Sequence, residues 1–126
     1  MNSLEKDVKK FMEGKYSMSD FNSYQRSAAK TAVYDDAYKV IYPTMGLANE
    51  AGEVVGKVKK VLRDKDGVFT SEDRDAIAKE IGDVLWYCAA LATDLELTLG
   101  YIASQNELKL SKRKANGTIG GSGDNR

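Results

Sequence analysis

The chain has 126 residues, 42% of them hydrophobic, which is enough to bury one core and excludes wholesale disorder. Its 19 basic and 19 acidic residues cancel, so no overall field attracts nucleic acid or an anionic membrane. Histidine is absent, which excludes Ser-His and Cys-His catalysis and leaves oxygen atoms as the ligands for any metal. We predict a single domain over residues 1–126.

Cysteine usage and hydropathy point to a reducing compartment. Cys88 is the only cysteine, so no internal disulfide can form, and its apolar neighbours favour packing as a small hydrophobic residue. The first 14 residues are charged and lack the apolar centre of a signal peptide. No apolar run is long enough to span a bilayer. We therefore expect a cytoplasmic protein.

Helical periodicity dominates from the first residues onward. A short helix that ends near Gly14 is predicted from four apolar positions, Leu4, Val8, Phe11 and Met12. A second helix is predicted to begin after Ser19 or Asp20 and to run to about Tyr34. Residues 35–42 fit either a helical continuation or an aromatic loop, because tyrosines recur there every four residues.

Two long helices follow. The only proline, Pro43, suits the first turn of a helix from about Thr44 to Lys65. The apolar stripe of this helix consists of Leu47, Ala51, Val54, Val55, Val58 and Leu62. Thr70 or Ser71 is expected to open the next helix, and Thr70 and Asp73 form a loose capping-box match. Its predicted buried face consists of Ile77, Ile81, Val84, Leu85, Cys88, Ala92 and Leu95.

A last helix is predicted from about Thr98 to Ala115. The glycine-rich residues 116–126 are expected to form a flexible tail, and residues 1–18 an N-terminal extension. No alternating strand pattern competes with the helical periodicity. The sequence therefore predicts an all-α bundle of four to five helices.

One nine-residue pattern, apolar-Ala-x-Glu-x-Gly-acid-Val-aliphatic, occurs twice, at residues 47–55 and 77–85. Each copy sets two acids three residues apart, where they are neighbours on a helix beside its apolar stripe. The four acids are Glu50, Glu53, Glu80 and Asp83. If the two stripes pack together, the acids gather at one rim of the seam, where each pairwise repulsion is about 3 kcal/mol at an effective dielectric near 20.

Such a cluster needs protons or cations. A single acidic pair on a helix ordinarily lies on a solvent-exposed face, and the repeat can also be explained by duplication of a helix. Two pairs that face each other instead favour divalent ions held by oxygen atoms. Gly52 and Gly82 each cost about 1 kcal/mol in mid-helix, so we expect another helix to approach closely there and bring the acids together.

The motif Glu50-x-x-Glu53, 26 intervening residues and Glu80-x-x-Asp83 resembles the signature of the MazG-type all-α nucleotide pyrophosphohydrolases. Four sequence segments are similar to those of short single-domain members, including phage-encoded ones. These segments are FNSYQRSAAKTA, GLANEAGEVVGKVKK, EIGDVLWYCAALA and NELKLSKRKANGTIGGSGD. The resemblance covers about residues 20–126. It implies the all-α NTP pyrophosphatase bundle, which oligomerises through helix packing as a dimer or as a tetramer of two dimers.

The resemblance also implies a reaction. Mg²⁺, with Mn²⁺ as a substitute, is held by the four acids and binds a nucleoside triphosphate. Water then attacks the α-phosphorus to give a nucleoside monophosphate and pyrophosphate. Glu50 or Glu53 is the candidate for orienting or deprotonating this water.

The last helix is the candidate for substrate binding. The resemblance implies that Lys109 and Arg113 contact the phosphates and that Asn106 contacts ribose or base. The same cations also suit a solvated helix end, where they complement the helix dipole. The tail from Gly117 to Gly123 could fold over the phosphates through its backbone N–H groups, and a disordered terminus is the alternative. The candidates for the base pocket are Tyr24, Gln25, Tyr34, Tyr38, Tyr42 and Trp86. For Trp86, subunit packing is the preferred interpretation over base stacking.

Alternative functions stay open. Within the superfamily they are a dUTPase-like or a phosphoribosyl-ATP pyrophosphohydrolase activity. In a different class, a non-catalytic helical module would use the acids for a structural metal or a partner. The basic helix end and the glycine tail argue against such a module, since a structural site needs neither. No nucleic acid or membrane is expected as a partner.

Overall fold

The structure is a computed structural model that describes residues 2, 5–6 and 20–126. The elements in these residues are α2 (Phe21–Ala29), the 3₁₀-helix η1 (Asp36–Tyr38), α3 (Ile41–Asp64), α4 (Ser71–Asp94) and α5 (Leu99–Ala115). The described segments contain no strand, which confirms the all-α prediction. The short helix predicted from Leu4 to Met12 falls mainly outside the described residues.

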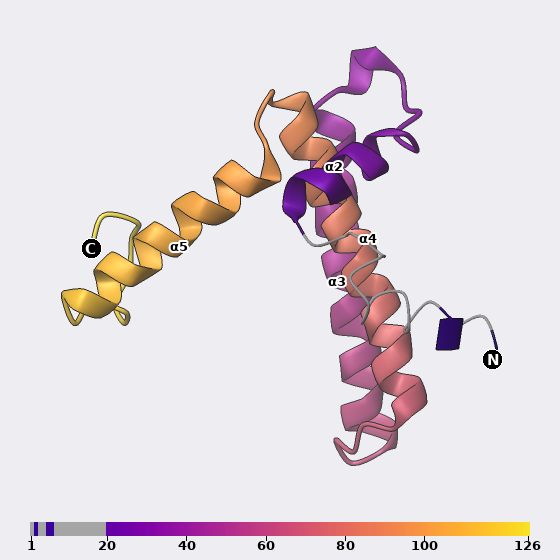
Figure 1. The fold of residues 1–126 in the computed structure, drawn as a ribbon. Helices are drawn as coiled ribbons and strands as arrows, with labels where there is room; N and C mark the ends of the chain where they lie inside the picture. Colours follow the sequence, from indigo (N-terminus) through magenta and orange to yellow (C-terminus); the bar gives the residue numbers. More distant parts are fainter. Residues whose placement is uncertain (1, 3–4, 7–19) are drawn as a thin grey trace.

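Helices α3 and α4 form a hairpin and lie side by side along their whole length (Figure 1). The predicted capping box is confirmed, because Thr70 and Asp73 exchange side chain–backbone hydrogen bonds at the start of α4. Lys65 at the end of α3 approaches Asp73 to 2.7 Å. The hydrogen bond from Lys65, followed by that from the Thr70 backbone, lowers the pKa of Asp73 to about 2.

The segment before α3 is shaped by its contacts with α4. Helix α2 ends at Ala29, earlier than predicted, and η1 occupies the ambiguous stretch. The Asp94 carboxylate accepts hydrogen bonds from the Tyr34 hydroxyl at 2.7 Å and the Val40 backbone N–H at 2.9 Å. Val40, at a φ of 68°, turns the chain into α3, which begins before Pro43.

A buried amide joins α2 to both ends of the α4–α5 connection. Gln25 is 9% exposed, and its amide nitrogen donates to the Thr93 hydroxyl at 3.0 Å and the Leu97 carbonyl at 2.9 Å. Its amide oxygen accepts from the Leu99 N–H at 2.8 Å, which supplies a partner to a free donor at the start of α5. Around it lies a core cluster of Ala28, Ala89, Ala92 and Leu99.

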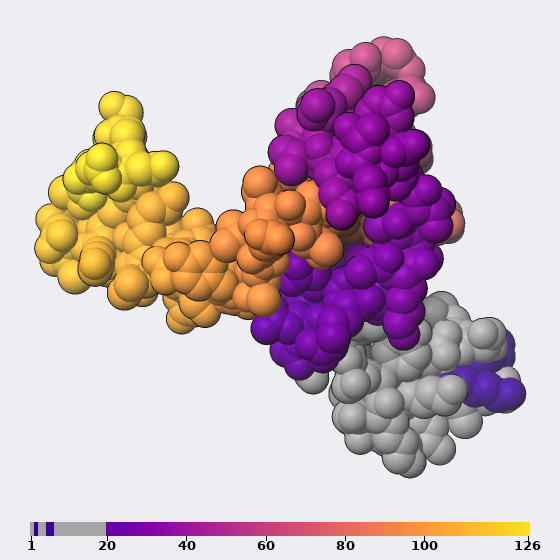
Figure 2. Space-filling model, turned by 90° about the horizontal axis from the view of Figure 1, so that it is seen from above, coloured from indigo at the N-terminus to yellow at the C-terminus, as the bar shows by residue number. Residues whose placement is uncertain are grey.

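Helix α5 leaves the rest of the fold as a projecting arm (Figures 1 and 2). A second contact holds its first turn: Asn22 accepts a hydrogen bond from the Gly100 N–H at 2.9 Å, at a place where a Cβ on Gly100 would crowd the Asn22 amide. The arm exposes apolar side chains along its length, including Tyr101, Leu108 and Leu110.

The predicted apolar stripes of α3 and α4 are only partly buried within the chain. Val55, Leu62 and Ile81 are 65%, 62% and 53% exposed, which corrects the expectation that these positions are covered. Val61, outside the predicted stripe, is 3% exposed instead. The reason is that α3 packs mainly on α4, so a single narrow face is covered while the stripe wraps further round the helix.

The prediction that another helix approaches Gly52 and Gly82 is wrong within this chain. A Cβ built on either glycine meets nothing within 4 Å, because both point outward. The close approach lies six residues before Gly52 on α3, where a Cβ on Gly46 would overlap the ring of Tyr87 from α4.

These two glycine environments predict opposite responses to alanine. Gly46→Ala should lower the free energy of unfolding by roughly 1–3 kcal/mol, because the Tyr87 ring must move. Gly52→Ala should raise it by about 0.5–1 kcal/mol, because the methyl group enters open space and removes mid-helix glycine. Urea unfolding of both variants checks this, and equal effects would contradict the packing at Gly46.

Candidate active site

Three of the four predicted acids converge across the α3–α4 seam. Glu50 from α3 and Glu80 and Asp83 from α4 each offer one carboxylate oxygen, and these oxygens lie within 4.8 Å of one another. Glu50 and Glu80 are half-buried, whereas Asp83 is exposed. Glu53, one turn along α3, is exposed and is not part of this group. One residue of α3 and two residues from successive turns of α4 thus bring carboxylate oxygens together at the seam.

The electrostatics of the group reflect crowded like charges. Desolvation first, then the charges of Asp83, Glu80 and Glu53, raise the pKa of Glu50 above its ordinary value. Lys57 offsets part of this negative charge, because its ammonium lies 3.6 Å from the Glu80 carboxylate. One lysine against three carboxylates leaves the group with a net negative charge.

Hard divalent cations fit this donor set. Mg²⁺ and Mn²⁺ prefer carboxylate oxygens, and sites for Mg²⁺ commonly use a few carboxylates together with substrate phosphates and water. The three oxygens are close enough to share an ion, and desolvation, followed by the neighbouring negative charges, raises the pKa of Glu50 at the same point. Glu50, Glu80 and Asp83 are therefore the residues that could hold a cation.

A pocket of about 330 Å³ opens beside the acids. Its lining consists of Thr31, Glu50, Asp83, Trp86 and Tyr87. The indole N–H of Trp86 donates to the Thr31 hydroxyl at 2.8 Å, and the Trp86 and Tyr87 rings meet edge to face at 5.0 Å. Burial, followed by a hydrogen bond with Tyr42, raises the pKa of Tyr87 and keeps its phenol protonated. The pocket thus combines acids, an aromatic wall and hydroxyl groups.

The sequence interpretation missed three residues near the acids. Lys57 lies seven positions after Glu50, on the same helix face, and contacts Glu80. Tyr87 lies four positions after Asp83, and the same spacing rule could have found it. Thr31 belongs to the turn after α2, and no sequence pattern connects it to the acids.

The predicted substrate residues lie elsewhere in the chain. Asn106, Lys109 and Arg113 are carried by α5, which projects away from the α3–α4 hairpin that bears the acids (Figure 1). Lys109 and Arg113 both approach the Asp124 carboxylate, at 3.2 and 3.3 Å. Gln25 is engaged inside the fold, where its amide fixes the start of α5. The single chain thus does not bring these four residues to the acids.

The predicted base-pocket candidates separate in the structure. Tyr34 and Tyr42 stack at a ring distance of 4.9 Å, while Tyr38 is exposed. Tyr24 packs against the core cluster. Of the set, Trp86 lines the pocket beside the acids. Cys88 is partly buried against the core, as predicted, and desolvation raises its pKa.

Comparison with known proteins identifies the family of the chain. The MazG nucleotide pyrophosphohydrolase domain matches residues 43–118. The chain is also 50% identical over 109 residues to the "Gene 37 protein" of Mycobacterium phage L5, an alignment that covers 82% of this chain and 96% of the relative. The chain belongs to the MazG nucleotide pyrophosphohydrolase family.

The MazG match contains all four acids and the three predicted substrate residues of α5, whereas Gln25 precedes it. No solved structure was found to match the chain. Among the described residues, no helix combines the length and the hydropathy needed to cross a membrane.

The crowding at Glu50 predicts a pH-dependent effect of Glu50→Gln. A carboxyl with a raised pKa in the folded state adds stability below its unfolded value of 4.5, and this stability is lost as pH rises through the folded pKa. At pH 7 in EDTA, the variant should therefore melt at a higher temperature than the wild type, and the difference should shrink toward pH 4. Added Mg²⁺ should reverse the order, because only the wild type keeps the full ligand set.

Glu72→Gln is the matched control for this measurement. Hydrogen bonds with its own backbone N–H, Thr70 and Ser71 lower the pKa of Glu72, so its replacement should reduce the melting temperature at pH 7. Calorimetry or a dye-based melt measures both variants. A Glu50→Gln melting temperature at or below the wild-type value at pH 7 in EDTA would contradict the repulsion.

Proposed function

We propose that the chain is a divalent-cation-dependent nucleoside triphosphate pyrophosphohydrolase. It cleaves a ribo- or deoxyribonucleoside triphosphate to the monophosphate and pyrophosphate, by attack of water at the α-phosphorus. The observation that carries this proposal is the convergence of Glu50, Glu80 and Asp83 in a chain of the MazG family. Phosphoryl transfer depends mainly on positioning and on neutralisation of charge, so a site without histidine is sufficient.

The acids have distinct roles in this proposal. Glu50, Glu80 and Asp83 hold Mg²⁺, for which Mn²⁺ can substitute, and Glu53 is a fourth ligand once substrate is bound. When bound, the cation neutralises the phosphates and acidifies water. Glu50 or Glu53 orients the attacking water or takes its proton.

The adjacent pocket is the proposed place of the nucleoside. Its volume of about 330 Å³ lies within the range of small-molecule sites. The Trp86 and Tyr87 rings offer a stacking surface, which tolerates different bases because every base has a flat face. The hydroxyl of Thr31 is held by Trp86 and offers a polar contact at the same wall.

The α5 arm supports sites that are shared between copies of the chain. Lys109 and Arg113 lie away from the acids of their own chain, and the arm exposes Tyr101, Leu108 and Leu110. Val55 and Ile81 are exposed on the hairpin itself. Packing of a second copy would cover these apolar side chains and could place its cations beside the acids. We propose a homodimer, or a tetramer of two dimers.

The activity predicts a clear response to Asp83→Asn. Loss of one anionic ligand should lower kcat/KM for the preferred triphosphate by more than about a hundredfold, while the helical content stays unchanged. The assay measures monophosphate and pyrophosphate from the common ribo- and deoxyribonucleoside triphosphates, with Mg²⁺. Asp75→Asn, an exposed position on α4 outside the acid group, should keep wild-type activity.

The same panel separates the alternatives. Hydrolysis restricted to dUTP, or to phosphoribosyl-ATP added to the panel, would assign one of the narrower activities. Stabilisation by Mg²⁺ without hydrolysis of any compound would instead identify a non-catalytic module and contradict the proposal.

Shared sites predict complementation between two inactive variants. Asp83→Asn damages the acids and Lys109→Gln removes a phosphate-binding cation. In a randomly mixed dimer with shared sites, about one quarter of the sites combine intact acids from one copy with intact cations from the other. Unfolding and refolding the two variants together should therefore restore activity above the mean of the separate variants. Activity equal to that mean would show that each site lies within one chain.

A further inference from the structure

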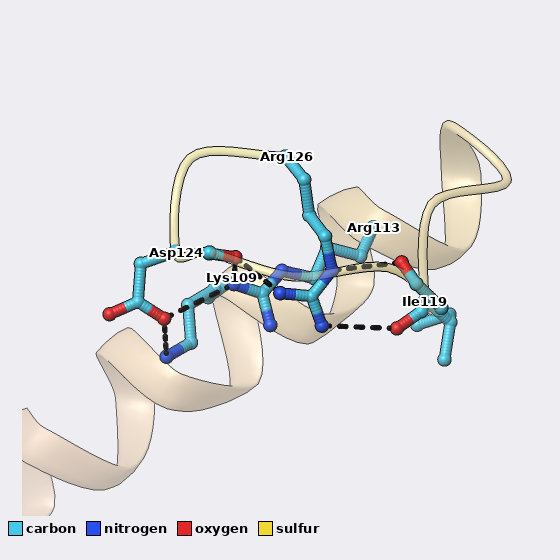
Figure 3. A network of polar contacts seen from close by, with 7 residues as sticks. Lys109, Arg113, Ile119, Asp124 and Arg126 are labelled. Atoms are coloured by element: carbon cyan, nitrogen blue, oxygen red, sulfur yellow. Dashed lines mark hydrogen bonds and ion pairs between the residues drawn. The ribbon is translucent and has the colours of Figure 1, made fainter.

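The residues after α5 fold back over its last turns (Figure 3). Thr118 donates its backbone N–H to the Arg113 carbonyl at 2.7 Å, and Gly121 and Gly123 take φ values of 91° and 85°. The Arg126 guanidinium donates to the carbonyls of residues 119, 120 and 123, which closes the loop. The tail, predicted to lack regular structure, lacks it in the described residues but has a defined set of polar contacts.

This loop places the Asp124 carboxylate on the two cations assigned to substrate phosphates. One oxygen of Asp124 lies 3.2 Å from the Lys109 ammonium and 3.3 Å from Nη2 of Arg113 (Figure 3). The hydrogen bond from Lys109, its charge and then Arg113 lower the pKa of Asp124, so the carboxylate is ionised at neutral pH. The Asp124 carboxylate therefore occupies the position in which a substrate phosphate is expected.

Arg113 is not fully used by this contact. Its side chain is 7% exposed, and Nη2 donates to both Asp124 and the Gly123 carbonyl, the latter at 3.1 Å. Its Nε–H is buried and has no hydrogen-bond partner among the described residues. An arginine fork binds phosphate through two parallel donors, and a buried donor without a partner is unfavourable. A phosphate group could use both donors, whereas the Asp124 carboxylate in this position uses one.

We propose that the loop of residues 117–126 is an anionic latch, in which Asp124 competes with the phosphates of the substrate for Lys109 and Arg113. This inference rests on the phosphate-binding role given to these residues in the proposed function. Binding of a polyphosphate displaces the carboxylate and releases the loop from the end of α5. Because Asp124 is 81% exposed, water screens its charge, and a polyphosphate that uses both donors of Arg113 can displace it.

A polyphosphate binding assay without metal tests the latch. In EDTA the acid group repels anions, so binding of inorganic tripolyphosphate reports on the cations of α5. Asp124→Asn should bind tripolyphosphate roughly two- to fivefold more tightly than wild type, the range expected for removal of an exposed ion pair. Glu107→Gln removes a charge from the same helix at a carboxylate that forms no ion pair with a described residue, and should change binding less.

Two further measurements follow the displacement itself. Arg113→Lys added to Asp124→Asn should abolish the gain, because lysine cannot offer two parallel donors. Hydrogen exchange of the Gly117 and Thr118 amides, which donate to the Lys114 and Arg113 carbonyls, should become faster when tripolyphosphate is added to wild type. Unchanged binding by Asp124→Asn, an equal gain in Glu107→Gln, or slower exchange of these amides would each overturn the latch.

These outcomes are independent of turnover. If no nucleotide is hydrolysed but Asp124→Asn still binds tripolyphosphate more tightly, the proposed function fails and the latch stands. If hydrolysis occurs and tripolyphosphate binding is indifferent to Asp124, the proposed function stands and the latch fails.

Discussion

Repulsion between carboxylates on α3 and α4 is the constraint on which the site depends. Helices free to separate would relieve it, but contacts at both ends of the hairpin hold them together. At one end the Thr70–Asp73 capping box and the Lys65 ion pair fix the turn. At the other end the Tyr87 ring rests on Gly46. The scaffold thus keeps the acids at close range, and the unfavourable charge remains available to attract a cation.

The fold separates the acidic α3–α4 hairpin from the basic residues Lys109 and Arg113 on the projecting helix α5. The acids are part of the hairpin, whereas the basic residues belong to a helix that the rest of the chain contacts mainly through its first turn. A triphosphate needs both signs of charge, one to hold its counter-ions and one to hold its terminal phosphates. In the proposed shared site, a second copy would cover the exposed apolar side chains of the hairpin and the arm and bring its cations to the acids.

Local spacing in the sequence was enough to predict which acids lie together. It was not enough to predict which face of each helix packs against its neighbour, because that depends on the rotation of the helix about its axis. The repeat located Glu50, Glu80 and Asp83, because two packed helices align equivalent turns. The repeat did not show that Gly52 points outward and that Gly46 contacts Tyr87, because both glycines are compatible with the same helix in either orientation. The prediction for the apolar stripes failed in a similar way, because periodicity does not distinguish faces buried within the chain from faces left open.

Long-range polar contacts were beyond the sequence altogether. Gln25 was a candidate for the substrate, and its role as a support for α5 follows only from the three elements that meet around it. The contact of Trp86 with Thr31 likewise joins residues 55 positions apart, which no motif describes. The oligomeric state and the role of each substrate residue remain predictions.

The anchoring of α5 by Asn22 and Gln25 makes this helix a lever. From Leu99 to Arg113 it spans fourteen steps, which is about 21 Å at 1.5 Å per residue. Tilting its first turn by about 10° would shift the guanidinium end by about 4 Å, more than the length of a hydrogen bond. The side-chain amides of Asn22 and Gln25 thus limit how far Lys109 and Arg113, at the other end of the helix, can move.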